Sequence, residues 1–461
     1  MKPFILIALL NSAFGVVAQN EASTIYIGKM LLDFRYDPPV VLSAQAKDSR
    51  ECAASICDAD GNLLFYSNGG VSPTAPWPGG VFKPDHSFMQ NGQMVDSGGC
   101  LSSFMGAMIL PDPIGITPTN RKYYLFTKDC VESSFSTIQY NSGLTYSIID
   151  MNASNGAGAV ISKYNQLVPY HVLSSHKTAY EPVTAVLDSD GELKSGGEGY
   201  WLFSYTGDSL YHLHFGVNGF DHFQKLVPGE GALLVSPDRN HLSVGTKLYR
   251  LDPVLGTVEF REEFPQYSKI AFSPDGSKMY VISGENLYQY DLNQPNVLST
   301  EFYIATLAPN SGLFLAPSKR IIIYQSEANF IDAQIVCANN SGAACGWDPS
   351  NISLGNAAFP LGAEIRPNIP AHYLFGNTTN CTLGIDELGD SHLNIRPNPV
   401  NDHFFIDGLD VETEYSLVNN LGQLVLSGKT DSSSPVGIKD LQEGTYFIRI
   451  ENRFLPVIKT N

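Results

Sequence analysis

The chain has 461 residues, of which 43% are hydrophobic and only 16% are charged. This length indicates two or three domains rather than one core, and the 41 glycines and 28 prolines favour short strands joined by many turns. The net charge of −18 and the lack of Lys or Arg clusters argue against a nucleic-acid partner, because phosphate binding depends on such clusters.

The first 18 residues have the pattern of a secretory signal peptide. Lys2 supplies the positive start, an apolar stretch follows, and small residues precede a cleavage site between Ala18 and Gln19. No later segment reaches the roughly 18 apolar residues that a membrane-spanning helix needs. We therefore expect an exported mature chain that begins at Gln19 and has no transmembrane helix.

Residues 19–376 are predicted to form an all-β body. Short apolar and aromatic runs, such as Lys122–Thr127 and Tyr200–Tyr205, alternate with turn residues. Similar turns recur before strands at Ser236–Arg239, Ser273–Gly276 and Ala316–Lys319. Repeats of about 40–50 residues are typical of β-propeller blades, and a body of about 355 residues then predicts seven blades. Six or eight blades are alternatives, and so is a pair of β-sandwiches, although the repeat spacing argues against the sandwiches.

The seven cysteines all lie in the body or in the predicted linker. Because export permits disulfides, pairs close in sequence are the natural candidates, although connectivity does not follow from sequence alone. The expected pairs are Cys52 with Cys57, Cys337 with Cys345, and then Cys100 with Cys130, which leaves Cys381 as the odd thiol.

Two segments invite a metal-binding interpretation. The segment Asp58–Asn62 has the oxygen density of a calcium loop, but Gly69 stands where a bidentate Glu is required, so we interpret it as a hairpin turn. His212 and His214 alternate on one predicted strand and therefore face the same side. Without a third ligand, solvent-facing or stacked imidazoles are the favoured interpretation. No cofactor is expected, with calcium as the alternative.

The sequence assigns no catalytic residue. Ser236 and Ser273 lack the flanking glycines of a nucleophile elbow, and nothing shows that carboxylates such as Asp129 and Glu181 converge. Trp77, in a loop rich in Pro and Gly, is a candidate for stacking on a sugar or anchoring a peptide, with a buried role as the alternative. The sequence favours a protein- or glycan-binding protein over an extracellular polysaccharide hydrolase or lyase, or a structural or gliding-associated component.

After a polar linker at residues 377–394, residues 395–461 form a second module. It opens with Pro397-Asn398-Pro399, contains a Leu-Gly-Gln-Leu-Val run around Gly422, and continues with Gly-Thr-Tyr-Phe-Ile-Arg-Ile from Gly444. This module resembles the C-terminal sorting domain of type IX (Por) secretion substrates in the Bacteroidota.

The resemblance implies a small immunoglobulin-like β-sandwich. It also implies passage through the periplasm, recognition by the type IX translocon and removal by a sortase-like peptidase, so that the protein is secreted or displayed on the outer surface.

The body resembles the propeller-like N-terminal region of secreted and gliding-associated surface proteins. The similar segments are Asp58–Gly70, Gly143–Asp150 and Ala271–Tyr280. The chain departs from this pattern after Leu361, where it reads GAEIRPNIPAHYLFG, so the closure of the last blade stays open. The resemblance brings no catalytic residues.

Overall fold

A computed structural model describes most of the chain and divides it into two compact units, Met1–Thr379 and Asn380–Asn461. The described residues are 20–71, 79–94, 99–130, 143–168, 181–188, 199–206, 208–264, 269–359, 366–376, 394–409, 413–419, 423–450 and 453–460. Cleavage at Ala18–Gln19, the loop with Trp77, Cys381 and Gly422 are expectations that lie outside these residues.

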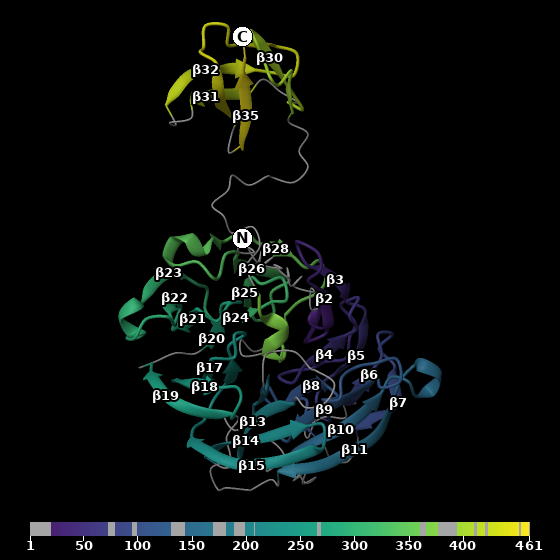
Figure 1. The fold of residues 1–461 in the computed structure, drawn as a ribbon. Helices are drawn as coiled ribbons and strands as arrows, with labels where there is room; N and C mark the ends of the chain where they lie inside the picture. The colour runs from purple at the N-terminus through teal and green to yellow at the C-terminus, as the bar shows by residue number, and fades with distance from the viewer. Residues whose placement is uncertain are drawn as a thin grey trace, which may run out of the picture. The chain divides into compact units, whose positions relative to one another are not determined.

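The body consists of successive antiparallel meanders (Figure 1). The first contains β1 (Thr24–Ile27), β2 (Met30–Asp33) and β3 (Val40–Ser43). The second contains β4 (Ala54–Cys57), β5 (Leu63–Ser67), β6 (Gly79–Phe82) and β7 (Phe88–Met94). The third contains β8 (Ala107–Pro111), β9 (Lys122–Lys128), β10 (Leu144–Asp150) and β11 (Ala159–Val168). The second and third are joined at their outer strands, where Ala159 pairs with Gln90 in parallel.

Four further meanders follow in chain order. The fourth contains β12 (Val183–Leu187), β13 (Tyr200–Thr206), β14 (Ser209–Gly216) and β15 (Gly219–Pro228). The fifth contains β16 (Leu233–Val235), β17 (His241–Val244), β18 (Lys247–Asp252) and β19 (Thr257–Glu263). The sixth contains β20 (Lys269–Phe272), β21 (Lys278–Ser283), β22 (Asn286–Asp291) and β23 (Phe302–Thr306). The seventh contains β24 (Ser311–Leu315), β25 (Ile321–Gln325), β26 (Phe330–Ile335), β27 (Trp347–Asp348) and β28 (Ile352–Ser353).

The described helices are all single 3₁₀ turns of three or four residues, and none is long and apolar enough to cross a membrane. They are η1 (Asn20–Ala22), η3 (Ser154–Gly156), η5 (Leu298–Thr300), η6 (Gly342–Cys345) and η7 (Ala371–Leu374).

Apolar clusters join each meander to the next and also join the seventh to the first. Phe34, after β2, meets Phe314 of β24 edge-on with ring centroids 6.4 Å apart, and this contact closes the circle. Among the described strands the body is therefore a seven-bladed propeller, as predicted. Two residues from each of the other six interfaces illustrate the clusters: Tyr26 and Phe82, Phe65 and Tyr123, Phe126 and Phe215, Phe203 and Leu242, Leu248 and Met279, and Tyr280 and Ile323.

Burial falls from the inner to the outer strand of a blade. Every residue of β8, β12 and β24 is buried, whereas most of β15 and β19 is exposed or half-buried. Inner strands packed on both faces need continuous apolar sequence, which explains why they appear as short uninterrupted hydrophobic runs. The chemistry that could meet a ligand therefore lies on the loops and outer strands.

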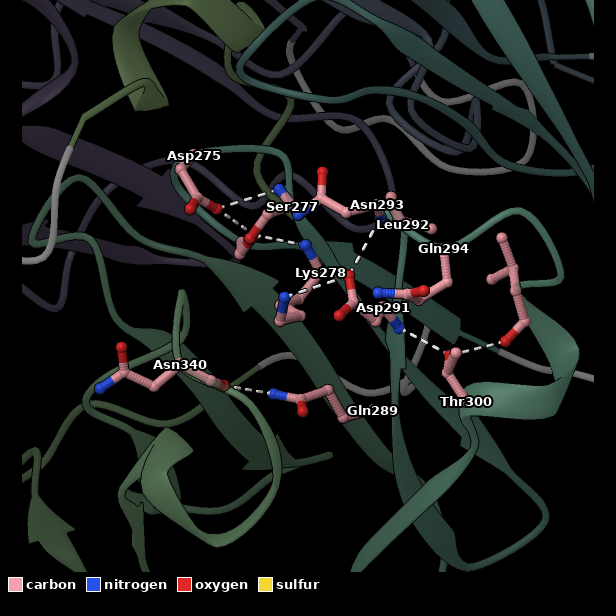
Figure 2. A network of polar contacts seen from close by, with 12 residues as sticks. Asp275, Ser277, Lys278, Gln289, Asp291, Leu292, Asn293, Gln294, Thr300 and Asn340 are labelled. Atoms are coloured by element: carbon pink, nitrogen blue, oxygen red, sulfur yellow. Dashed lines mark hydrogen bonds and ion pairs between the residues drawn. The ribbon is translucent and has the colours of Figure 1, made fainter.

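The Ser-Pro-Asp turns are built as structural corners (Figure 2). In the sixth blade the Asp275 carboxylate accepts the Ser277 backbone N–H at 2.9 Å and the Ser273 hydroxyl at 2.7 Å. The Ser273 Oγ in turn accepts the backbone N–H of Lys278, whose ammonium lies 3.2 Å from Asp291 on the neighbouring strand. Because the Ser hydroxyl is bonded within its own turn, it has a structural role there.

The disulfides differ from the expected pairs. Cys100 and Cys130 are bonded. Cys52 and Cys57 are free and buried, so that pairing is wrong: most of the intervening segment is the extended strand β4, and five extended residues span about 16 Å, too far for a disulfide. The Cys337–Cys345 pairing is also wrong. The Cys345 thiol is free and lies against Tyr280, whereas Cys337 is itself in a disulfide, but not with Cys345.

The second unit is a two-sheet sandwich. One sheet contains β29 (Asn394–Arg396), β30 (His403–Asp407) and β33 (Val436–Gly437), and the other contains β31 (Thr413–Asn419), β32 (Leu424–Thr430), β34 (Gly444–Ile450) and β35 (Arg453–Lys459). Their facing sides share one core, which includes Phe404, Leu417 and Ile448. This is the immunoglobulin-like sandwich that the sequence predicted.

Candidate functional site

The centre of the propeller is occupied by the chain itself. Residues 366–376, which follow the seventh blade, run along the inner strands, and η7 is the light green turn near the middle of the ring (Figure 1). Ala371 packs in the cluster between the fourth and fifth blades, Tyr373 in that between the second and third, and Leu374 against that between the sixth and seventh. This segment, called the plug below, therefore contacts most of the ring.

Asn368 fixes the plug by long-range hydrogen bonds, which a local sequence pattern does not predict. Its side-chain amide donates to the carbonyls of Met105, Ala107 and Val183 at 3.1, 2.8 and 2.8 Å, and these belong to the third and fourth blades. Arg366 is buried and donates to the Ile270 carbonyl at 2.8 Å in the sixth blade. Buried carbonyls at the axis are thus satisfied by the plug rather than by water.

The far end of the plug is equally enclosed. His372 is buried, and burial lowers its pKa to about 3, so the ring is neutral at physiological pH. Lys319 donates to the Tyr373 carbonyl at 2.9 Å, and burial lowers the pKa of this lysine to about 8. The cavity left beside the plug has a volume of about 50 Å³, which is room for a few water molecules and is far below the roughly 300 Å³ or more of a ligand pocket.

A larger cleft of about 740 Å³ opens between the first, second and seventh blades. Its walls are the β1–β2 turn around Lys29, the β3–β4 loop with Asp48, Arg50 and Glu51, and the β25–β26 turn with Glu327. Backbone bonds tie these loops together, for instance from the Ser49 N–H to the Gly28 carbonyl at 3.1 Å. The cleft is therefore a preformed feature held by rigid blades.

The cleft is polar and carries charges of both signs. Lys29 is exposed and lies 3.9 Å from Asp48, a separation at which the pair contributes little stability in water. Glu327 also lines the cleft, and its backbone N–H donates to the Phe359 carbonyl at 3.1 Å. Phe359 itself is only 2% exposed, so its ring offers no stacking surface to a ligand.

The two carboxylates considered for catalysis do converge, but on a buried lysine. Burial lowers the pKa of Lys128 to about 7, although the nearby carboxylates of Glu181 and Asp129 act in the opposite direction and raise it. Glu181 accepts the Phe104 backbone N–H and Asp129 the Gly143 backbone N–H, each at 2.7 Å. All three charged side chains are buried, so this cluster holds loops together and is closed to a polymeric substrate.

His214 has a role different from the metal ligand considered above. Its two ring nitrogens lie 2.8 Å from Asp188 and 2.7 Å from Asp221. The bond to Asp188 is the main cause that raises the pKa of His214, and the bond to Asp221 adds to it. With both nitrogens engaged by carboxylates, His214 is an ion-pairing residue of the fourth blade.

The partner of His212 is a histidine that sequence reasoning missed. The Nε2 atoms of His212 and His222 lie 3.2 Å apart, across the β14–β15 pair. His222 is the residue opposite His214 in the register of this hairpin, and that register is the signal that could have found it. Among the described residues, no group of three or more His, Cys, Asp or Glu side chains is placed to hold a metal ion.

The segment considered as a calcium loop is a hairpin turn between β4 and β5. The Asp58 carboxylate accepts the backbone N–H groups of Asp60 and Asn62 at 3.0 and 2.8 Å, and the Gly61 N–H donates to the Asp58 carbonyl. Gly61 has φ of 82°, a left-handed conformation that favours glycine. The oxygen-rich sequence is thus explained by the turn, and calcium stays an untested alternative.

The Pro-Asn-Pro opening of the second unit is tied to its last strand. The Asn398 amide donates to the Pro456 carbonyl at 2.8 Å, and its side-chain oxygen accepts the Ile458 N–H at 2.9 Å. Pro397 and Pro399 flank this asparagine, and Gly444 begins β34 with φ of 153°. The Pro-Asn-Pro motif therefore lies at the edge of the sandwich, next to β35.

Comparison with known families identifies the second unit. Residues 394–459 match the model of the secretion system C-terminal sorting domain. No curated protein matches the chain.

The solved structures that the chain resembles share little sequence identity with it. AztD from Citrobacter koseri is 11% identical, with a TM-score of 0.38, 73% of this chain and 88% of that chain covered. The β-propeller domain of Cps50 (Swd1) from Myceliophteria thermophila is 9% identical, with a TM-score of 0.33 and coverage of 66% and 94%. PorZ, a surface component of the type IX secretion system of Porphyromonas gingivalis, is 10% identical, with a TM-score of 0.21 and coverage of 96% and 75%.

The molecule is thus an exported seven-bladed β-propeller followed by an immunoglobulin-like sorting domain. The sorting domain marks it more particularly as a substrate of the type IX secretion system, which delivers it to the cell surface or the extracellular space.

Proposed function

We propose that the chain is a non-catalytic binding protein that acts outside the cell and takes its ligand in the cleft between the first, second and seventh blades. The observation that supports this most is the plug. In the part of the chain that the structure describes, residues 366–376 fill the central channel and leave a cavity of about 50 Å³ there, whereas the cleft of about 740 Å³ has the size of an ordinary binding pocket.

The lining of the cleft favours an extended protein segment over a neutral glycan. Lys29, Asp48 and Glu327 give the lining of the cleft charges of both signs. Sugar recognition usually uses an exposed aromatic face, and the one aromatic ring among the described lining residues, Phe359, is buried. We therefore propose a charged surface loop or terminus of another exported or surface protein as the ligand.

Site-specific photo-crosslinking in intact producing cells tests this proposal. A photoreactive residue is placed at Lys29 or Glu327 in the cleft, and at Lys225 as the control, which is exposed on the outer strand β15. Both cleft positions are expected to give an adduct with the same partner protein, and Lys29→Glu is expected to weaken binding of that purified partner at least tenfold, while Lys225→Glu leaves it unchanged. The absence of adducts from the cleft, or equal adducts from Lys225, would contradict the proposal.

A further inference from the structure

Two imidazoles on the outer part of the fourth blade face each other in a geometry that suits a metal ion. Two Zn–N bonds of about 2.0–2.1 Å at a tetrahedral angle place the nitrogens about 3.3 Å apart. The Nε2 atoms of His212 and His222 are 3.2 Å apart. The Gln224 side chain, opposite His212 in the strand register, lies within hydrogen-bonding reach of the same imidazole.

We propose that His212 and His222 bind one divalent ion of a late transition metal, such as Zn²⁺ or Cu²⁺. Gln224 supplies an amide oxygen, and water fills the remaining positions. Imidazole nitrogen is the protein ligand that these metals share, and their affinity for such ligands is higher than that of Mn²⁺ or Mg²⁺. The site goes beyond the binding role of the cleft and does not depend on it.

The surroundings orient the two ligands. The His212 ring stacks on Trp201 at 4.8 Å with an interplanar angle of 17°, and His222 meets the same indole edge-on at 5.5 Å. Trp201 is held in turn by the Gly256 backbone, where any side chain would collide with the indole ring. The imidazoles therefore rest on a fixed platform instead of moving freely on the surface, which lowers the cost of ordering them around an ion.

The charges around the site also suit a cation. His214, the third imidazole on this face, is engaged by Asp188 and Asp221, and these two carboxylates outweigh the single charge of a protonated His214. His222 is exposed, so an ion can enter from solvent without opening the blade.

The test uses the full mature chain without a histidine tag and titrates Zn²⁺ by isothermal calorimetry. Wild-type protein is expected to bind one ion per chain, and His222→Gln, at an exposed position that does not threaten folding, is expected to weaken binding at least tenfold. The matched control is His403→Gln, an exposed histidine of β30 in the other unit, which is expected to leave binding unchanged.

A second measurement separates a metal site from a mere hydrogen bond between two histidines. Cu²⁺ bound at His212 and His222 would quench the fluorescence of the adjacent Trp201, so quenching is expected in the wild type and its loss in His222→Gln. Two results would overturn the inference: no one-to-one binding of either ion at roughly 100 μM protein, or binding that His222→Gln does not alter.

Discussion

At the scale of single residues, the plug depends on side chains that are unusual for the centre of a protein. His372 is a neutral histidine with a pKa of about 3, lowered by burial and, to a smaller extent, by Arg239. Its partners are aromatic, since its ring lies 4.1 Å from Tyr373 and 6.2 Å from Tyr200. Burial disfavours protonation of this imidazole in the folded body. The stability of the body therefore depends on pH through His372.

The sign of that dependence follows from the lowered pKa. Above pH 6.5 His372 is neutral in the folded and the unfolded chain and contributes no dependence. Below pH 6.5 His372 is protonated in the unfolded chain but stays neutral in the folded chain. The free energy of unfolding therefore falls as pH falls, by about 1.4 kcal/mol per pH unit, until pH reaches the folded-state pKa of about 3.

Urea unfolding at pH 7, 6, 5 and 4 checks this expectation with wild type and His372→Gln. The substitution itself costs stability at pH 7, but the difference between the two proteins should shrink as pH falls, because the variant lacks the titrating group. Other acid-sensitive groups are common to both chains and cancel. Parallel curves at all four pH values would show that His372 is accessible to protons in the folded state.

At the scale of elements, the plug is a segment that packs against several blades at once at the centre of the ring. It carries no strand or helix periodicity, and it is anchored through Asn368 to carbonyls of the third and fourth blades, one of them 261 residues earlier in the chain. Removing it would expose the apolar inner strands and take away the Asn368 amide that donates to the carbonyls of Met105, Ala107 and Val183.

Two truncated chains test what the plug contributes to the stability of the body. A chain that ends at residue 379 keeps the plug, and a chain that ends at residue 365 lacks it, while both lack the sorting domain. We expect the shorter chain to melt roughly 10 °C or more below the longer one in circular dichroism, because several buried contacts are lost together. Equal melting temperatures would show that the blades close the ring without the plug.

Most elements could be predicted from sequence and a few could not, for identifiable reasons. The strands and the Ser-Pro-Asp corners follow from local alternation and turn chemistry, as at β9, β13 and Ser273. The plug escaped prediction because its bonds are long-range and its sequence resembles a loop. His222 escaped because its meeting with His212 depends on the β14–β15 register, and the Cys52–Cys57 pairing failed because β4 is extended between them.

At the scale of the whole molecule, the chain consists of two units with separate cores, the body and the sorting domain. The body has a closed hydrophobic ring and a preformed cleft, and the second unit has its own core around Phe404 and Ile448. A sorting signal that folds independently can be recognised whatever body precedes it. The sorting domain could be predicted from sequence, because the Pro-Asn-Pro opening and the strands that follow are local features.

Deletion of residues 394–459 in a host that has a type IX secretion system tests the central claim most directly. Surface, medium and periplasmic fractions are compared by immunoblotting, and circular dichroism of the purified variant checks that the body still folds. We predict that the folded body accumulates in the periplasm, while the full chain reaches the surface or the medium. Arrival of the deleted variant outside the cell at the level of the full chain would contradict the account.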